Sequence, residues 1–109
     1  MSKFTLADLE QRVKERAKAS PDVSYTRKLL DKGVAHCAKK FGEEAVEVVL
    51  AAVAEDKERV IAESADMLYH LLVLLQARGV TLAEVEALLE TRTRKSGLEE
   101  KASRTEPRP

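Results

Sequence analysis

The sequence predicts an all-α protein, an antiparallel bundle of about four to five helices that is completed by homodimerisation or a higher oligomer. Helix start signals recur along the chain, whereas no segment alternates between apolar and polar residues as a strand would. The composition agrees, because 44% of the 109 residues are hydrophobic and only 4% are aromatic. Such a chain is too apolar to be disordered and short enough to form a single domain.

The first predicted helix begins after Thr5, whose hydroxyl can cap it together with Asp8 three residues later. Its apolar side is formed by Leu6, Leu9 and Val13. The run Ser20-Pro21-Asp22 ends this helix, because serine, proline and aspartate favour a turn. A short second helix follows over residues 24–30 and ends near Gly33.

Two long helices form the centre of the predicted fold, over residues 35–54 and from residue 57 to Arg78. Only Glu55 and Asp56 connect them, and Asp56 can cap the second helix, which ends at a left-handed Gly79. Helices joined by so short a turn must lie antiparallel. Both are apolar nearly all round, and one chain has too few other helices to cover them. A homodimer with a shared core is the simplest solution.

The last predicted helix covers residues 82–94, where Thr81 and Glu84 form a second capping box. We assign residues 1–95 to a single all-α domain. The polar residues 96–109 are expected to form a mobile C-terminal tail.

The charge balance predicts neither a nucleic-acid partner nor a membrane partner, since Lys plus Arg and Asp plus Glu both total 19. The longest apolar stretch, residues 67–75, is far below the roughly 20 residues that a membrane span requires. The first residues lack the apolar core that is typical of a signal peptide, and the single Cys37 suits a reducing compartment. A cytoplasmic location is expected.

Four acidic residues on the two long helices predict a metal site. Glu63 and Asp66 share one face of the most apolar helix, and Glu44 and Glu47 share a face of the preceding one. A single glutamate on a helix is usually solvated, but buried carboxylates without partners are costly. Four carboxylates suit a hard cation such as Mg²⁺, with positions left for water and phosphate. His70 continues the face, as a packed core histidine or as a neighbour of the ligands.

Several other chemistries are excluded by the residues present. Cys37, His36 and His70 are not spaced as a zinc site, and neither glutamate pair has the Glu-x-x-His pattern of a di-iron bundle. No glycine-rich phosphate-binding loop is present. An all-carboxylate magnesium site therefore indicates a phosphate substrate.

The acidic pattern resembles that of a known superfamily, the all-α MazG-like nucleoside triphosphate pyrophosphohydrolases. The matching residues are Glu43-Glu44-Ala45-Val46-Glu47 and, 15 residues later, Glu63-Ser64-Ala65-Asp66. Within that superfamily the chain is similar to the phosphoribosyl-ATP pyrophosphohydrolases of histidine biosynthesis. This closer resemblance rests on Ser24-Tyr25-Thr26, Lys39-Lys40-Phe41-Gly42 and the run from Ala65 to Leu74.

The resemblance implies that phosphoribosyl-ATP is hydrolysed between its α and β phosphates, which gives phosphoribosyl-AMP and pyrophosphate. It implies that Mg²⁺ is bound by Glu44, Glu47, Glu63 and Asp66. Glu43, or Glu47 in its place, would deprotonate the attacking water. Contacts with the substrate would come from Ser24, Tyr25, Thr26, Lys39 and Lys40.

Two alternative functions are compatible with the sequence. One is a house-cleaning enzyme that hydrolyses dUTP, dCTP or an aberrant nucleotide with the same metal site, although the Ser24-Tyr25-Thr26 segment argues against it. The other is a non-catalytic helical dimerisation module whose acidic residues are merely solvated.

Overall fold

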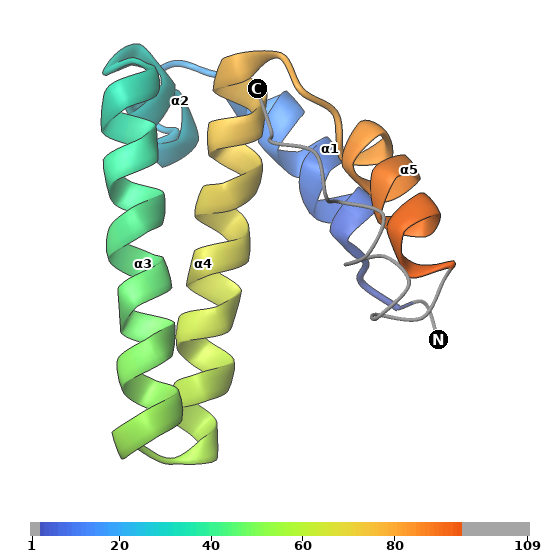
Figure 1. The fold of residues 1–109 in the computed structure, drawn as a ribbon. Helices are drawn as coiled ribbons and strands as arrows, with labels where there is room; N and C mark the ends of the chain where they lie inside the picture. The colour runs from blue at the N-terminus through green and yellow to red at the C-terminus, as the bar shows by residue number, and fades with distance from the viewer. Residues whose placement is uncertain (1–2, 95–109) are drawn as a thin grey trace.

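The computed structural model describes residues 3–94 and arranges them as five helices without a strand (Figure 1). The helices are α1 (Leu6–Ala17), α2 (Tyr25–Asp31), α3 (Val34–Ala54), α4 (Lys57–Arg78) and α5 (Leu82–Thr93). The all-α prediction is therefore confirmed for these residues. The predicted tail, residues 96–109, lies outside the part of the chain that is described.

Local capping signals determine where the helices begin. Thr5 and Asp8 form a reciprocal capping box at the start of α1, and Thr81 and Glu84 form another at the start of α5. Asp56 caps α4 by accepting from the amide of Arg59. These side chains satisfy amides that have no partner within the first helical turn, as the sequence predicts.

Two glycines at helix boundaries have a positive φ angle. Gly33 precedes α3 with φ of 93°, and Gly79 ends α4 with φ of 70°. Residues with a side chain rarely adopt these angles, so both positions favour glycine. The chain can thus turn sharply at both places.

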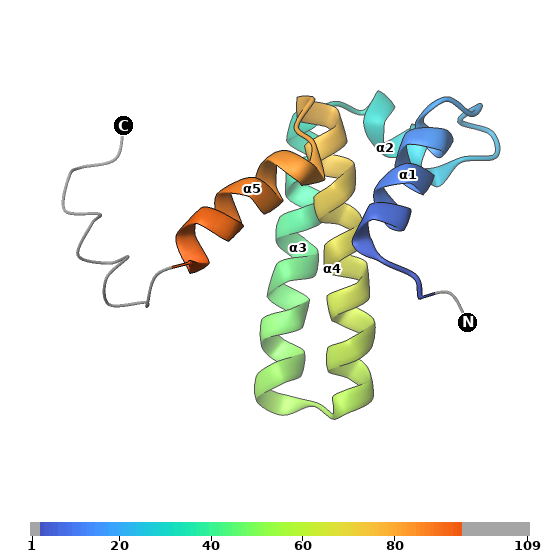
Figure 2. The same cartoon turned by 90° about the vertical axis from the view of Figure 1, so that its right-hand side faces the viewer.

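The helices α3 and α4 form a long antiparallel hairpin, with α1 and α2 packed at the end that is far from its turn (Figures 1 and 2). The buried core lies at this end and consists of Val13, Leu29, Cys37, Leu72, Val73 and Leu82. In Figure 2, α5 extends away from the end of α4 and diverges from α1, although both helices lie on the α4 side of the hairpin in Figure 1. The amide of Leu82 donates to Glu10 of α1 over 2.7 Å and fixes the start of α5.

The expected burial of the long helices on every side is not reached within one chain. On α3 the exposed apolar residues recur at spacings of three and four and form one stripe, which consists of Val46, Val49, Leu50 and Val53. Each of them is more than half exposed. A stripe of this kind normally marks a surface that another helix covers.

By length and composition, α4 could also cross a membrane. However, it carries Glu63, Asp66 and His70 in its interior and packs along α3. Ionisable side chains are costly in the middle of a bilayer. These features indicate a helix hairpin of a soluble protein.

Candidate metal centre

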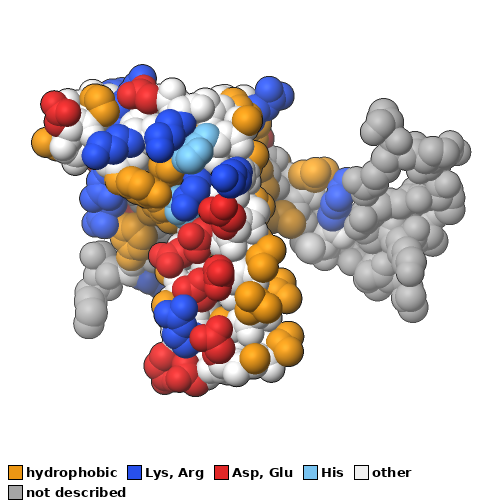
Figure 3. Space-filling model, turned by 90° about the vertical axis from the view of Figure 1, so that its left-hand side faces the viewer, with side chains coloured by type: hydrophobic (Ala, Val, Ile, Leu, Met, Phe, Trp, Pro, Cys, Tyr) orange, Lys and Arg blue, Asp and Glu red, His pale blue; other side chains and the backbone are white. Residues whose placement is uncertain are grey.

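Three carboxylates converge between the two long helices. Glu44 of α3 and Glu63 and Asp66 of α4 each offer an oxygen, and these atoms all lie within 4.8 Å of one another. The short turn at residues 55–56 sets the register that places residue 44 opposite residues 63–66. Figure 3 shows acidic side chains gathered along one edge of the hairpin, beside a strip of hydrophobic ones. The predicted meeting of the two acidic faces thus holds for three residues.

The geometry of this group fits a small divalent cation. Mg²⁺ binds oxygen ligands at about 2.1 Å, so two ligands on opposite sides of the ion lie about 4.2 Å apart. Oxygens within 4.8 Å of one another need only small side-chain movements to reach such positions. Glu63 is buried whereas Asp66 is exposed, so the group is anchored on one side and open to solvent on the other.

Two glutamates of the acidic motif lie outside this group. Glu47 is exposed and is not one of the three convergent carboxylates, although the sequence predicts it as a ligand. Glu43 is also exposed, and its Oε1 lies 3.4 Å from the Nζ atom of Lys40. Lys39 is exposed on the same helix.

The sequence interpretation missed the cation that contacts the buried carboxylate. Arg59 donates from Nη2 to Oε1 of Glu63 over 3.1 Å. The spacing of four residues between Arg59 and Glu63 could have predicted this ion pair, although a basic residue before an acidic one is the weaker order on a helix.

His70 connects the carboxylates to a group of aromatic rings. It is buried, and its ring lies edge-on to Tyr69 at 5.1 Å and to Tyr25 at 6.3 Å between centroids. Burial lowers the pKa of His70, and the nearby carboxylate of Glu44 opposes this shift. Burial thus favours the neutral imidazole, and it fits the first of the two roles expected for His70, that of a packed core histidine.

The Ser24-Tyr25-Thr26 segment divides into two structural hydroxyls and one exposed ring. Ser24 is buried, where its Oγ accepts from the amide of Arg27 and donates to the carbonyl of Arg16. Thr26 is buried as well, and its hydroxyl pairs with that of Tyr69. Tyr25 is 54% exposed. Of the three, Tyr25 is thus the residue whose side chain is free to contact a ligand.

Comparison with known proteins identifies one family along nearly the whole described chain. The profile of the phosphoribosyl-ATP pyrophosphohydrolase family matches residues 6–93. A phosphoribosyl-ATP pyrophosphatase 1 from Bradyrhizobium diazoefficiens is 64% identical, covering 97% of this chain and 100% of the relative. The phosphoribosyl-ATP pyrophosphatase 1 of Rhodopseudomonas palustris is 62% identical over 95% of this chain and 97% of its own. A phosphoribosyl-ATP pyrophosphatase from Agrobacterium fabrum is 53% identical, covering 98% of this chain and 100% of the relative.

Proposed function

The chain belongs to the phosphoribosyl-ATP pyrophosphohydrolase family, and we propose that its hydrolysis of phosphoribosyl-ATP depends on Mg²⁺ held by Glu44, Glu63 and Asp66. The reaction cleaves the bond between the α and β phosphates and gives phosphoribosyl-AMP and pyrophosphate, the second step of histidine biosynthesis. The observation that carries the metal proposal is the convergence of three carboxylates from two helices. An oxygen-only ligand set of this kind suits Mg²⁺.

Each group of residues in the site is assigned a separate role in the reaction. When bound, Mg²⁺ would supply neutralisation of the charge on the phosphate oxygens. Glu43 or Glu47, the exposed glutamates beside the ligands, accepts the proton of the attacking water. Lys39 and Lys40 contribute positive charge for the phosphates, and Lys40 already lies beside Glu43.

Recognition of the substrate is assigned to the exposed ring of Tyr25. Its ring lies 6.5 Å from that of Tyr69 and nearly parallel to it, at an angle of 20°. An exposed aromatic ring of this kind can stack on a base or pack against a sugar. Ser24 and Thr26 have structural roles instead. The hydroxyl of Ser24 caps α2, and that of Thr26 joins α2 to α4.

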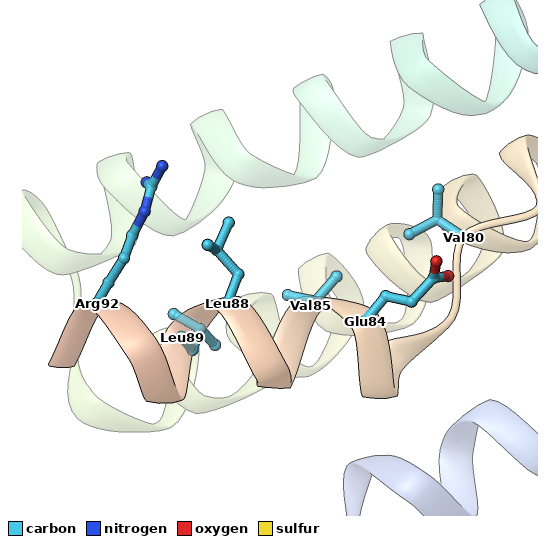
Figure 4. Close-up of a pocket in the computed structure, with 6 residues that line it drawn as sticks. All are labelled: Val80, Glu84, Val85, Leu88, Leu89 and Arg92. Atoms are coloured by element: carbon cyan, nitrogen blue, oxygen red, sulfur yellow. The ribbon is translucent and has the colours of Figure 1, made fainter. Parts of the chain in front are cut away.

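A second copy of the chain is proposed to cover the stripe on α3. The C-terminal part of the described chain presents a further apolar surface, with Leu88 and Leu89 more than half exposed. Together with Val80 and Val85, they line a shallow pocket of about 280 Å³ on α5 (Figure 4). Exposed apolar surfaces of this kind often mark sites of association between proteins. A homodimer or higher oligomer would remove both apolar surfaces from water. We also propose that this assembly is cytoplasmic.

The substrate assignment is tested by comparing turnover of phosphoribosyl-ATP with that of dUTP, dCTP and the other deoxynucleoside triphosphates. We expect release of pyrophosphate from phosphoribosyl-ATP to exceed that from every deoxynucleotide, and to stop when a chelator removes Mg²⁺. Preference for a deoxynucleotide would instead support a house-cleaning enzyme. Activity that survives complete removal of divalent cations would contradict the metal proposal.

A further inference from the structure

A positive side chain contacts the buried carboxylate of the group. Arg59 donates from Nη2 to Oε1 of Glu63 over 3.1 Å and from Nε to Oε1 of Glu55 over 3.2 Å. The Glu63 side chain is only 10% exposed, whereas that of Arg59 is 51% exposed. The guanidinium therefore neutralises a carboxylate that is largely removed from water.

We propose that Arg59 competes with the divalent cation for Glu63 and thereby sets the metal affinity of the site. This inference rests on the proposed metal centre, because it gives Arg59 a role only where Glu63 is a ligand. Arg59 is in this respect a positioning residue, since it acts through Glu63.

Electrostatics favours competition over simultaneous binding. A carboxylate oxygen that accepts a charge-assisted hydrogen bond is already partly neutralised and is a weaker ligand for a second cation. A dication on Glu63 would also lie within a few ångströms of the guanidinium, where like charges repel strongly. Breaking the contact between Arg59 and Glu63 relieves both effects.

The surroundings of Arg59 make its displacement easy. Its side chain can remain paired with Glu55, so it does not lose its only partner when it leaves Glu63. Its half-exposed guanidinium can also bind water. The backbone stays in place, because the amide of Arg59 is bonded to Oδ1 of Asp56 at the cap of α4. Only the side chain has to move.

The test measures Mn²⁺ binding to the metal-free protein by the electron paramagnetic resonance signal of free Mn²⁺. We expect Arg59→Gln to bind Mn²⁺ about two- to five-fold more tightly than the wild type, because the half-exposed ion pair between Arg59 and Glu63 weakens binding by about this factor. The matched control is Arg94→Gln, which removes the same charge from an arginine paired with Glu90 on the surface. This control should bind as the wild type does.

Thermal unfolding gives a second readout that does not require activity. Metal-free Arg59→Gln should melt below the wild type, because Glu63 loses its counter-charge. Added Mn²⁺ should then raise its melting temperature more than that of the wild type, since tighter binding stabilises the folded state more. Equal or weaker Mn²⁺ binding by Arg59→Gln would overturn the inference and show that Arg59 does not compete.

The variant Glu63→Gln separates failure of this inference from failure of the metal centre. If Glu63→Gln weakens Mn²⁺ binding but Arg59→Gln does not strengthen it, the role of Arg59 alone is wrong. If the wild type binds no Mn²⁺ at all, the proposed metal centre is wrong and the inference falls with it.

Discussion

The hydroxyl groups of Thr26 and Tyr69 lie 2.6 Å apart and join the short helix α2 to the long helix α4. Thr26 is buried, so this hydrogen bond is shielded from water. The same contact holds the ring of Tyr69 against those of Tyr25 and His70, which also contact each other. One hydrogen bond thus positions the exposed ring of Tyr25 relative to the carboxylates.

Removal of the Tyr69 hydroxyl should destabilise the protein. Tyr69→Phe leaves the hydroxyl of Thr26 without this partner in the core, which costs about 1–2 kcal/mol. Thr26→Val should cost less, because Tyr69 is only partly buried and its hydroxyl can bind water instead. Urea unfolding of both single variants and the double variant measures these costs. Strictly additive effects would show that the two hydroxyls do not interact.

The same tyrosine predicts a change in stability at alkaline pH. Burial raises the pKa of Tyr69 above its ordinary value of 10.0, although the hydrogen bond with Thr26 opposes the shift. Above pH 10.0 the unfolded state releases this proton while the folded state retains it, so the free energy of unfolding falls as pH rises. Below that pH Tyr69 keeps its proton in both the folded and the unfolded state, so it does not change the free energy of unfolding. Tyr69→Phe should therefore lose part of the alkaline decline, and parallel curves for variant and wild type would contradict the prediction.

Amide substitution of the carboxylates should separate a three-ligand site from a four-ligand site. We expect Glu44→Gln, Glu63→Gln and Asp66→Asn to reduce turnover by roughly 10²–10³-fold, the effect of losing one group that stabilises developing charge. Circular dichroism should show that their helices remain. Mn²⁺ affinity should also fall in these three variants but not in Glu47→Gln, because Glu47 is exposed and lies outside the group of three. A comparable loss of metal affinity in Glu47→Gln would favour four ligands.

The thiol of Cys37 should be unreactive in the native protein. It is 1% exposed, its Sγ donates to the carbonyl of Leu29 over 3.3 Å, and burial raises its pKa. A dithiobis reagent reacts with the thiolate, which is both rare and shielded here. We expect reaction only when denaturant unfolds the chain. A cysteine placed at the exposed Val23 in a Cys37→Ala background should react at once, and equally fast reaction of native Cys37 would refute its burial.

The fold was predictable from the sequence where local interactions decide it. Thr81 with Glu84, and likewise the caps of α1 and α4, lie within a few residues of the amides that they satisfy. The direction of α5 was not predictable in the same way. It depends on the contact between Leu82 and Glu10, which are 72 residues apart, and on packing that no local pattern encodes.

The candidate site was predictable only in part. Helical periodicity and the short turn brought Glu63 and Asp66 together with an acidic residue of α3. Periodicity alone could not separate Glu44 from Glu47, because the rotation of α3 about its axis is set by packing against α4. The structural role of Thr26 was hidden for a similar reason, since its partner Tyr69 lies on another helix.

A charge on the apolar stripe of α3 should abolish self-association. Val49→Glu places a carboxylate in the middle of the stripe, where a second copy would have to bury it without a partner. We expect a dimer or higher oligomer for the wild type and a monomer for the variant, as measured by sedimentation velocity over a range of concentrations.

The matched control for this change is Val23→Glu, because Val23 is 82% exposed in the turn before α2 and lies outside the stripe. The control should associate as the wild type does. In addition, the melting temperature of the wild type should rise with protein concentration, because association stabilises only the folded chain. A wild type that stays monomeric at every concentration, or a Val49→Glu variant that still associates, would show that α3 is not the contact surface. Loss of association in both variants would instead indicate an effect of net charge.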